Sequence, residues 1–543
     1  MKFNLSVYGL KLSKVVLQIF VLAFVLALST LAMGQGSDRN STLIVGTSFN
    51  LITLDPGRSF ELTAIFTNKA LYETLVTLPP DGNGGVIPLL ATSWEASGDG
   101  LTYTFTLRDG VRFSSGNPLT AADVVWSIER FKGLKGSASF LASTIESVAA
   151  PDPSTAVIQL NQPDPAILSK LTVGNFAVLD SKTLIAQGGT SGPDADQTDQ
   201  AEQFLDGASA GSGPYVLAST DLSSQVVMQR NPNYWRAAAP LDTYILSNIP
   251  AAAVQKLTLE AGDIDIALDV SPDQAQSLRD NPDLKVLTPP SLTTIFLGFN
   301  QDPQIAGGTV NRVGVEQAVR SALDYEGIRS LGGPGSVTPG SVVPVGLRGA
   351  LDLSEAAQRD LDKARQLLAD AGFASGLDLE LEYPGSFTFA NVDFDVVAQK
   401  VQADLAEVGI RAKLTPSPVD TFFTRLRAGE IPFFLSFWVP DFLDALNYAA
   451  FLPGGVYDAR VNWSAVSDTP AYQQLQQFIQ QAEITTDGAQ RAELFRQAQR
   501  LLQTDGPFVP LLQPSLTIAT RANVEGFVFN PQWRIDPYLV SKR

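Results

Sequence analysis

The chain has 543 residues, more than one hydrophobic core can organise, because cores stop growing at about 250–300 residues. It contains no cysteine and no histidine, which excludes disulfides, thiol or imidazole catalysis, Cys/His zinc sites and His-anchored haem. The net charge is −18 and no run of basic residues follows Lys14, which argues against nucleic-acid binding. We therefore expect at least two lobes, no cofactor and no nucleic-acid partner.

The N-terminus has the pattern of a signal peptide. Three lysines precede an apolar stretch from Val15 to Ala32, and Ala32-Met33-Gly34 places small residues where signal peptidase cleaves. We predict a signal peptide over residues 1–35, cleaved near residue 34, and export to the periplasm. An uncleaved anchor is the alternative, because the apolar stretch is just long enough to span a bilayer. A lipoprotein is excluded, since the chain has no cysteine.

The first clear secondary-structure pattern lies at residues 101–107, where apolar residues alternate with threonine. This period of two predicts a strand with one buried face. Thr120-Ala-Ala-Asp123 then resembles a capping box and leads into apolar residues at helical spacing up to Phe131. The region therefore combines strand and helix.

The second half of the chain alternates helices and strands. Apolar spacing predicts helices over 361–371 and 394–408, each followed by a glycine that suits a left-handed cap, and a strand over 410–414. Further helices are expected over 470–482 and 489–503, with strands at 508–512 and 516–519. The order helix, glycine, strand is typical of an α/β fold.

Several sequence blocks carry a resemblance to one family. They are Leu71-Tyr-Glu-Thr-Leu75, Pro88-Leu-Leu-Ala-Thr-Ser-Trp94, Gly100 to Phe113, Leu119 to Val125, Gly211-Ser-Gly-Pro-Tyr215, Arg230 to Trp235, Val315 to Leu323 and Asp362 to Gly372. In this order they resemble the extracytoplasmic solute-binding proteins of the peptide, opine and nickel ABC importer family. The resemblance extends over nearly the whole chain after the predicted signal peptide.

The resemblance implies an α/β fold of the two-lobed periplasmic-binding-protein type (type II), with a small α/β domain inserted in the first lobe. It places lobe I at 42–80, 205–290 and 512–543, the extra domain at 81–204 and lobe II at 291–511. It also implies a monomeric binding protein without enzymatic activity, which closes on a ligand by a hinge motion and delivers it to the transmembrane subunits of an ABC permease.

The resemblance also points to a ligand site in the stretch from Phe434 to Tyr448. In dipeptide-binding relatives an aspartate here meets the ligand's ammonium group, and Asp441 occupies that position. A carboxylate in a partly dehydrated cleft needs a cation, which the ammonium group of a peptide or other small zwitterion supplies. The further candidates are Trp438 as a flat wall, Ser436 and Phe437 through their backbone groups, and Asp444, Asn447 and Tyr448.

Each candidate also has a purely structural interpretation. Asp441 and Asp444 could cap a helix that starts near Leu443, and Trp438 could belong to the core. One departure from the family concerns the ligand's carboxylate: dipeptide binders hold it with an arginine early in the helix at 393–409, where this chain has Asp395 and Val396. The departure argues against a strict dipeptide binder and leaves longer peptides, opines, oligosaccharides or other sugars, and amine-containing compounds open. Nickel is disfavoured because histidine is absent.

Other acidic residues in the sequence are compatible with an enzyme rather than a binding protein. Asp263, Asp265 and Asp269 resemble a cation site, and Glu380 with Glu382 resembles the acid pair of a glycosidase. Both groups alternate with apolar residues as in a strand, which favours carboxylates that face solvent. A secreted, carboxylate-based hydrolase is therefore the alternative from another class.

Overall fold

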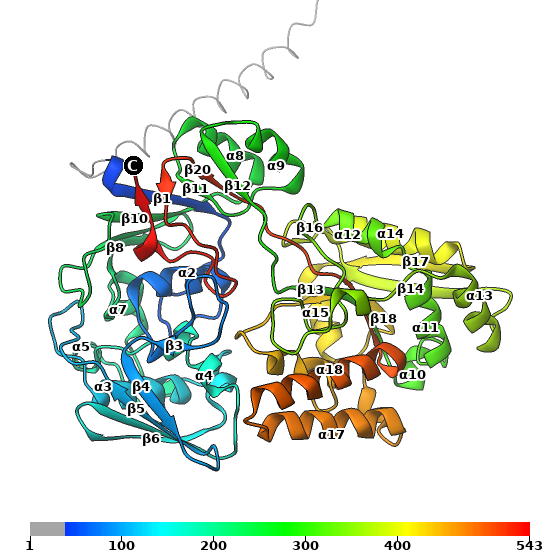
Figure 1. The fold of residues 1–543 in the computed structure, drawn as a ribbon, viewed down its shortest axis with the longest axis horizontal. Coiled ribbons are helices and arrows are strands. Elements are labelled where there is room, and N and C mark those ends of the chain that lie inside the picture. The colour runs from blue at the N-terminus through cyan, green and yellow to red at the C-terminus, as the bar shows by residue number, and fades with distance from the viewer. Residues whose placement is uncertain (1–38) are drawn as a thin grey trace, which may run out of the picture.

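The computed structural model describes residues 39–543, and these form two bodies that lie side by side, each with its own large sheet (Figure 1). The predicted mixed α/β fold with two lobes is confirmed. The predicted signal peptide lies outside the described residues. Among residues 39–543, no helix combines the length and the apolar character that a bilayer span requires.

The first lobe is built on a seven-stranded sheet that gathers strands from both ends of the chain. β1 lies between β10 and β11 and runs parallel to both, and the remaining neighbours pair antiparallel. In sheet order the strands are β12 (Leu284–Leu287), β20 (Ile518–Arg521), β11 (Ile266–Ala267), β1 (Thr42–Thr47), β10 (Thr243–Asn248), β9 (Gln225–Arg230) and β8 (Tyr215–Asp221). Helices α2 (Leu62–Leu71), α8 (Ala252–Ala261) and α9 (Pro272–Arg279) also belong to this lobe.

A four-stranded antiparallel sheet lies below it in Figure 1, formed by a single stretch of chain. Its order is β4 (Ala91–Ala96), β5 (Thr102–Leu107), β7 (Thr155–Leu160) and β6 (Ile145–Asp152). The strand predicted at 101–107 is β5, and its apolar residues are buried. Helix α3 (Ala121–Gly133) begins at the predicted capping box, where the Thr120 N–H donates to the Asp123 carboxylate at 2.9 Å.

The second lobe contains a five-stranded sheet with helices around it. The order is β17 (Ile410–Ser417), β14 (Leu377–Pro384), β18 (Phe433–Trp438), β13 (Thr294–Phe299) and β19 (Phe508–Leu512). The predicted helices are α13 (Leu361–Asp370), α14 (Phe394–Ala406), α17 (Pro470–Ile484) and α18 (Gly488–Asp505). Gly372 and Gly409, which follow α13 and α14, have φ of +90° and +87°, the left-handed conformation that their positions predicted.

The chain passes between the two large sheets twice. One passage joins β12 to β13 through residues 288–293, and the other joins β19 to β20 through residues 513–517. These crossings connect the two lobes in Figure 1. Two short connections constrain the relative position of two rigid bodies but allow them to rotate about a hinge.

Residues 177–205 pack with the first lobe's large sheet. Ala177, Leu179, Leu184, Ala201 and Leu205 share a buried cluster with strands β1, β8 and β10. The cluster around the four-stranded sheet draws its residues mainly from 75–178. The segment predicted as the later part of the extra domain therefore contributes to the core of lobe I, although the divisions at 81 and 204 themselves remain predictions.

The expectation that the acidic residues at 263–269 and 380–382 face solvent is wrong for two of them. Glu382 is buried and pairs with Arg425 at 2.6 Å. The other is Asp265. Its side chain is buried, accepts a hydrogen bond from the Ile44 N–H at 2.8 Å and pairs with Arg39 at 2.8 Å and Lys542 at 2.7 Å. The reason is that β11 has only two residues, so Asp265 precedes the strand and lies against β1 and the C-terminal residues. No group of acidic side chains in the described range is arranged to hold a metal ion.

A buried ionic network joins α3 to the loops of lobe I. Arg130 of α3 is 1% exposed and donates to both carboxylate oxygens of Asp55 at 2.8 and 2.6 Å. It also donates to both oxygens of Asp199 at 2.8 Å. Arg58, which is partly exposed, pairs with the same two carboxylates at 3.4 and 3.2 Å, so two guanidinium groups share the neutralisation of two buried charges.

We predict that Arg130→Met destabilises the protein by about 3–5 kcal/mol, because two buried carboxylates lose their closest counter-charge and keep only the longer contacts with Arg58. The control is Arg365→Met, which breaks an exposed pair with Asp362 at 2.8 Å and is expected to change stability by less than about 0.5 kcal/mol. Urea unfolding of both variants measures the difference. Equal losses in the two variants would contradict the assigned role of Arg130.

Candidate functional site

The candidate site is formed where strand β18 leaves the sheet of the second lobe. β18 lies between β14 and β13, and its last residue, Trp438, pairs in register with Thr294. The chain then turns out of the sheet and enters a 3-10 helix, η5 (Ala445–Phe451). Residues 438–448, which we call the site segment, therefore start from a rigid strand and end in a short helix.

Asp441 is held by a relay of two hydrogen bonds within the site segment. The Trp438 Nε1–H donates to Asn447 Oδ1 at 2.8 Å, and Asn447 Nδ2 donates to Asp441 Oδ2 at 3.1 Å. Burial raises the pKa of the Asp441 carboxyl, and the bond from Asn447 opposes that rise. Within residues 39–543, no lysine or arginine forms an ion pair with this carboxylate, so its charge is held in place but not neutralised.

Asp441 faces a cavity of about 890 Å³ between the lobes, which we call the aromatic cavity. The second lobe contributes Phe423, Phe437, Trp438 and Tyr457 to its wall, and the first lobe contributes Phe60 and Phe140. The last two rings meet edge to face with centroids 5.9 Å apart and remain partly exposed, at 36% and 47%. A cavity of this size, whose lining combines aromatic rings with polar and charged groups, has the character of a ligand site.

The aromatic cavity also contains charged side chains that the sequence did not single out. Lys170 is paired with Asp164 at 2.6 Å, and Glu483 lies on α17 with its pKa raised by burial. Arg427 and Arg460 are the last residues of α15 (Val419–Arg427) and α16 (Val456–Arg460). These residues come from separate elements of two lobes, so no local pattern in the sequence brings them together.

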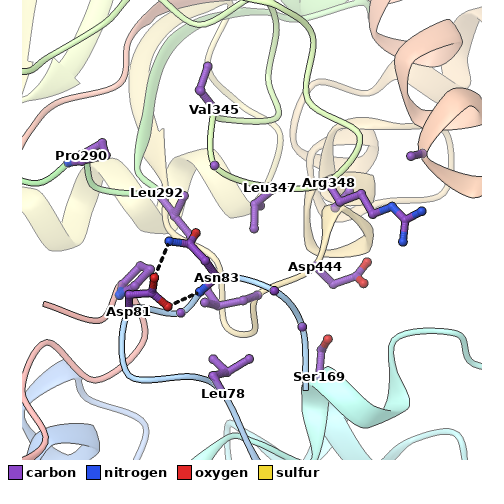
Figure 2. A pocket seen from close by; sticks show the side chains of 18 of the residues that line it. Leu78, Asp81, Asn83, Ser169, Pro290, Leu292, Val345, Leu347, Arg348 and Asp444 are labelled. Atoms are coloured by element: carbon purple, nitrogen blue, oxygen red, sulfur yellow. Dashed lines mark hydrogen bonds between the residues drawn. The ribbon is translucent and has the colours of Figure 1, made fainter. Parts of the chain in front are cut away.

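Asp444 lies in a second cavity, on the other side of the site segment. This cavity, of about 730 Å³, is bounded by the loop at residues 81–85 of the first lobe and by Arg348 and Arg491 of the second, and we call it the loop cavity. Figure 2 shows the loop, with Asp81 and Asn83, reaching towards Leu292 and Leu347. Asp444 pairs with Arg491 and accepts a hydrogen bond from the Leu446 N–H at 2.8 Å, which caps η5.

The remaining predicted residues occupy different places in and behind the wall of the aromatic cavity. Ser436 and Tyr448 are buried in the core, and the Tyr448 hydroxyl donates to the Leu292 carbonyl. Phe437 lies on the cavity wall and stacks on Phe389 with ring centroids 4.2 Å apart. Trp438, Asp441 and Asn447 are the predicted polar or amphipathic residues that the structure brings together.

Phe442, next to Asp441, connects the site segment to the other lobe. Its ring is 4% exposed and belongs to the buried cluster around the four-stranded sheet of the first lobe. The Lys170 Nζ lies 5.5 Å from the centre of this ring. The residue that follows the candidate ligand-binding carboxylate therefore makes an apolar contact between the lobes.

The start of helix α14, where dipeptide-binding relatives are expected to have an arginine, contributes nothing to the aromatic cavity. Asp395 lies in the first turn of the helix, and its carboxylate accepts a hydrogen bond from the Ser386 N–H at 2.9 Å. Neither Asp395 nor Val396 is part of the cavity wall. A cationic group for this site has to come from another element.

We predict opposite stability effects for two substitutions in the site segment. Because burial raises the folded-state pKa of Asp441 above its unfolded value near 3.8, its charge costs stability at neutral pH, and that cost disappears below this value. Asp441→Asn should therefore stabilise the ligand-free protein by about 0.5–1 kcal/mol near neutral pH. The gain should shrink at about pH 4.

The matched substitution Asp444→Asn should destabilise the protein by about 1–3 kcal/mol, because Arg491 loses its counter-charge. Thermal unfolding at both pH values measures the two effects. A loss of stability in Asp441→Asn at neutral pH would show that the carboxylate is a structural group.

Comparison with known proteins places this chain in a known family. Residues 85–457 match the model of the bacterial extracellular solute-binding proteins, family 5 Middle. The chain is 28% identical over 529 residues to the probable D,D-dipeptide-binding periplasmic protein DdpA of Escherichia coli (strain K12), covering 94% of this chain and 96% of that protein. It is 26% identical over 504 residues to the dipeptide-binding protein of the same organism, covering 89% and 90%.

Solved structures agree with the fold. HbpA2 from Haemophilus parasuis matches with a TM-score of 0.77 and 26% identity, over 92% of this chain and all (100%) of that one. DppA from Helicobacter pylori, an ABC transporter-associated periplasmic binding protein in complex with the peptide STSA, matches with a TM-score of 0.72 and 22% identity, over 92% and 98%. These relatives are binding proteins of transport systems rather than enzymes, and the chain belongs to the bacterial extracellular solute-binding proteins of family 5.

Proposed function

We propose that this protein captures a peptide-like ligand with a free ammonium group in the aromatic cavity and delivers it to the permease of an ABC importer. The observation that carries the proposal is the half-buried carboxylate of Asp441, which is oriented by Asn447 and lacks an ion-pair partner among the described residues. A partly desolvated carboxylate is stabilised by a cation that donates hydrogen bonds to it. A peptide's terminal ammonium is such a cation.

The walls of the cavity suit the rest of a peptide. Aromatic rings from both lobes provide apolar surface for ligand side chains with little dependence on their identity. The volume of about 890 Å³ lies within the range of about 300–1,000 Å³ that is typical of ligand pockets. The names of the curated relatives, which include dipeptide-binding proteins, support the same ligand class.

Closure of the lobes would connect binding to delivery. A ligand that contacts Phe60 and Phe140 on one lobe and Asp441 on the other favours the closed arrangement, because only that arrangement allows both sets of contacts. The closed form is then the state that a permease recognises.

We further propose that the protein is a monomer exported to the periplasm, where residues 1–34 have been removed. The periplasmic relatives and the signal-like pattern of the first residues support this location. Cleavage can be tested by N-terminal sequencing of the protein recovered from cells, which should begin at Gln35. A chain that retains residues 1–35 would indicate the anchored alternative.

We predict that peptides of several residues stabilise the wild-type protein and that their N-acetylated forms do so much less. At 100 times its dissociation constant a ligand raises stability by about 2.7 kcal/mol, which thermal unfolding detects readily. Asp441→Asn should weaken the binding of free-amine peptides by about 2–3 kcal/mol, because a charged hydrogen bond is lost. Its effect on N-acetylated peptides should be small.

The same screen should include opines and oligosaccharides. Stabilisation by an oligosaccharide alone would retain the transport role and exclude the ammonium site. Turnover of a glycoside or a peptide would favour the hydrolase. Equal binding of free and N-acetylated peptides would show that Asp441 has no contact with the ligand's ammonium group.

A further inference from the structure

The aromatic cavity has a cationic side as well as an acidic one. Three basic side chains reach it, which are Lys170, Arg427 and Arg460. The charge of Lys170 is already neutralised by Asp164 at 2.6 Å. Neither arginine forms an ion pair within residues 39–543, although the chain has 56 acidic residues against 38 basic ones. An unneutralised arginine in a cavity of so acidic a protein indicates a site for an anionic group.

Arg460 is connected to Asp441 by a continuous wall of contacts. Its guanidinium group lies 4.6 Å from the centre of the Tyr457 ring, and that ring is 5.7 Å from the ring of Trp438. Trp438 donates to Asn447, which donates to Asp441. The anionic and cationic groups are therefore linked by direct contacts within the second lobe, with aromatic rings between them.

The two arginines differ in how firmly they are held. Arg460 is half-buried and lies against Tyr457, which is fully buried and donates through its hydroxyl to the Phe437 carbonyl at 3.3 Å. Arg427 is exposed, lies 6.0 Å from the ring of Phe423, and ends a nine-residue helix, where a positive charge is favourable in any case. A planar guanidinium group that is already oriented binds a carboxylate with a smaller loss of entropy.

We propose that Arg460 binds the carboxylate of the same ligand whose ammonium group meets Asp441, so that the cavity selects zwitterionic ligands such as peptides with a free C-terminus. This inference rests on the proposed function. It also supplies a cation for a site in which helix α14 offers Asp395 and Val396 instead of an arginine. The ring of Trp438, which is partly exposed and packs against the buried Tyr457, would contact the middle of the ligand.

The test is a competition for the protein between peptides that differ only at the C-terminus. A mixed pool of peptides of two to six residues, each present as the free acid and as the C-terminal amide, is captured by the purified protein and analysed by mass spectrometry. The wild type should enrich the free acids about 10-fold to 100-fold, as expected for a charged hydrogen bond. Arg460→Gln should reduce this preference to nearly none, and Arg460→Lys should retain part of it.

Arg427→Gln is the matched control, because it removes the same charge from the same cavity. It should retain the preference for free acids, since Arg427 is exposed and less firmly held than Arg460. Thermal unfolding of the ligand-free variants checks that each is folded. Free acids that are not preferred by the wild type, a preference that survives in Arg460→Gln, or an equal loss in both arginine variants would overturn the role of Arg460 while leaving peptide binding in place. If the wild type captures no peptide in any form, the proposed function itself fails.

Discussion

The structure of the site depends on one carboxylate that is oriented but not neutralised. Trp438 and Asn447 fix Asp441 at the edge of the aromatic cavity, and burial raises its pKa. Such a group costs stability in the ligand-free protein, and binding sites commonly retain groups of this kind because they serve function. A cationic ligand group removes this unfavourable interaction. Its removal then contributes to the free energy of binding.

The position of the site segment explains how one contact can influence the whole molecule. The segment starts from strand β18 of the second lobe, and Phe442 inserts into the buried cluster around the four-stranded sheet of the first. Asp441 and Phe442 are neighbours, so a ligand held by one constrains the other. A ligand shifts a hinge equilibrium only by the difference in its affinity for the two states, and a site divided between two lobes provides that difference.

The fold could be predicted from sequence wherever local chemistry determines it. The alternation at 102–107, the capping box at Thr120 and the glycines after α13 and α14 each act within a few residues, and the structure confirms them. Asp265 was misjudged because its partners, Arg39 and Lys542, lie at the two ends of the described chain. The separation of Asp441 and Asp444 into two cavities and the contribution of Phe60 depend on how the lobes meet, and Arg460 reaches the site through its packing on Tyr457. No local pattern encodes either arrangement.

The most direct test of the account is the pH dependence of peptide affinity, measured by calorimetry on the wild type and on Asp441→Asn. Because burial raises the pKa of Asp441, protonation should abolish the ammonium contact in mildly acidic solution, above the unfolded value near 3.8. The account predicts that wild-type affinity falls as the pH is lowered through this range and that the affinity of the variant stays nearly constant. The same fall in both proteins, or none in the wild type, would contradict a role for the Asp441 charge in binding.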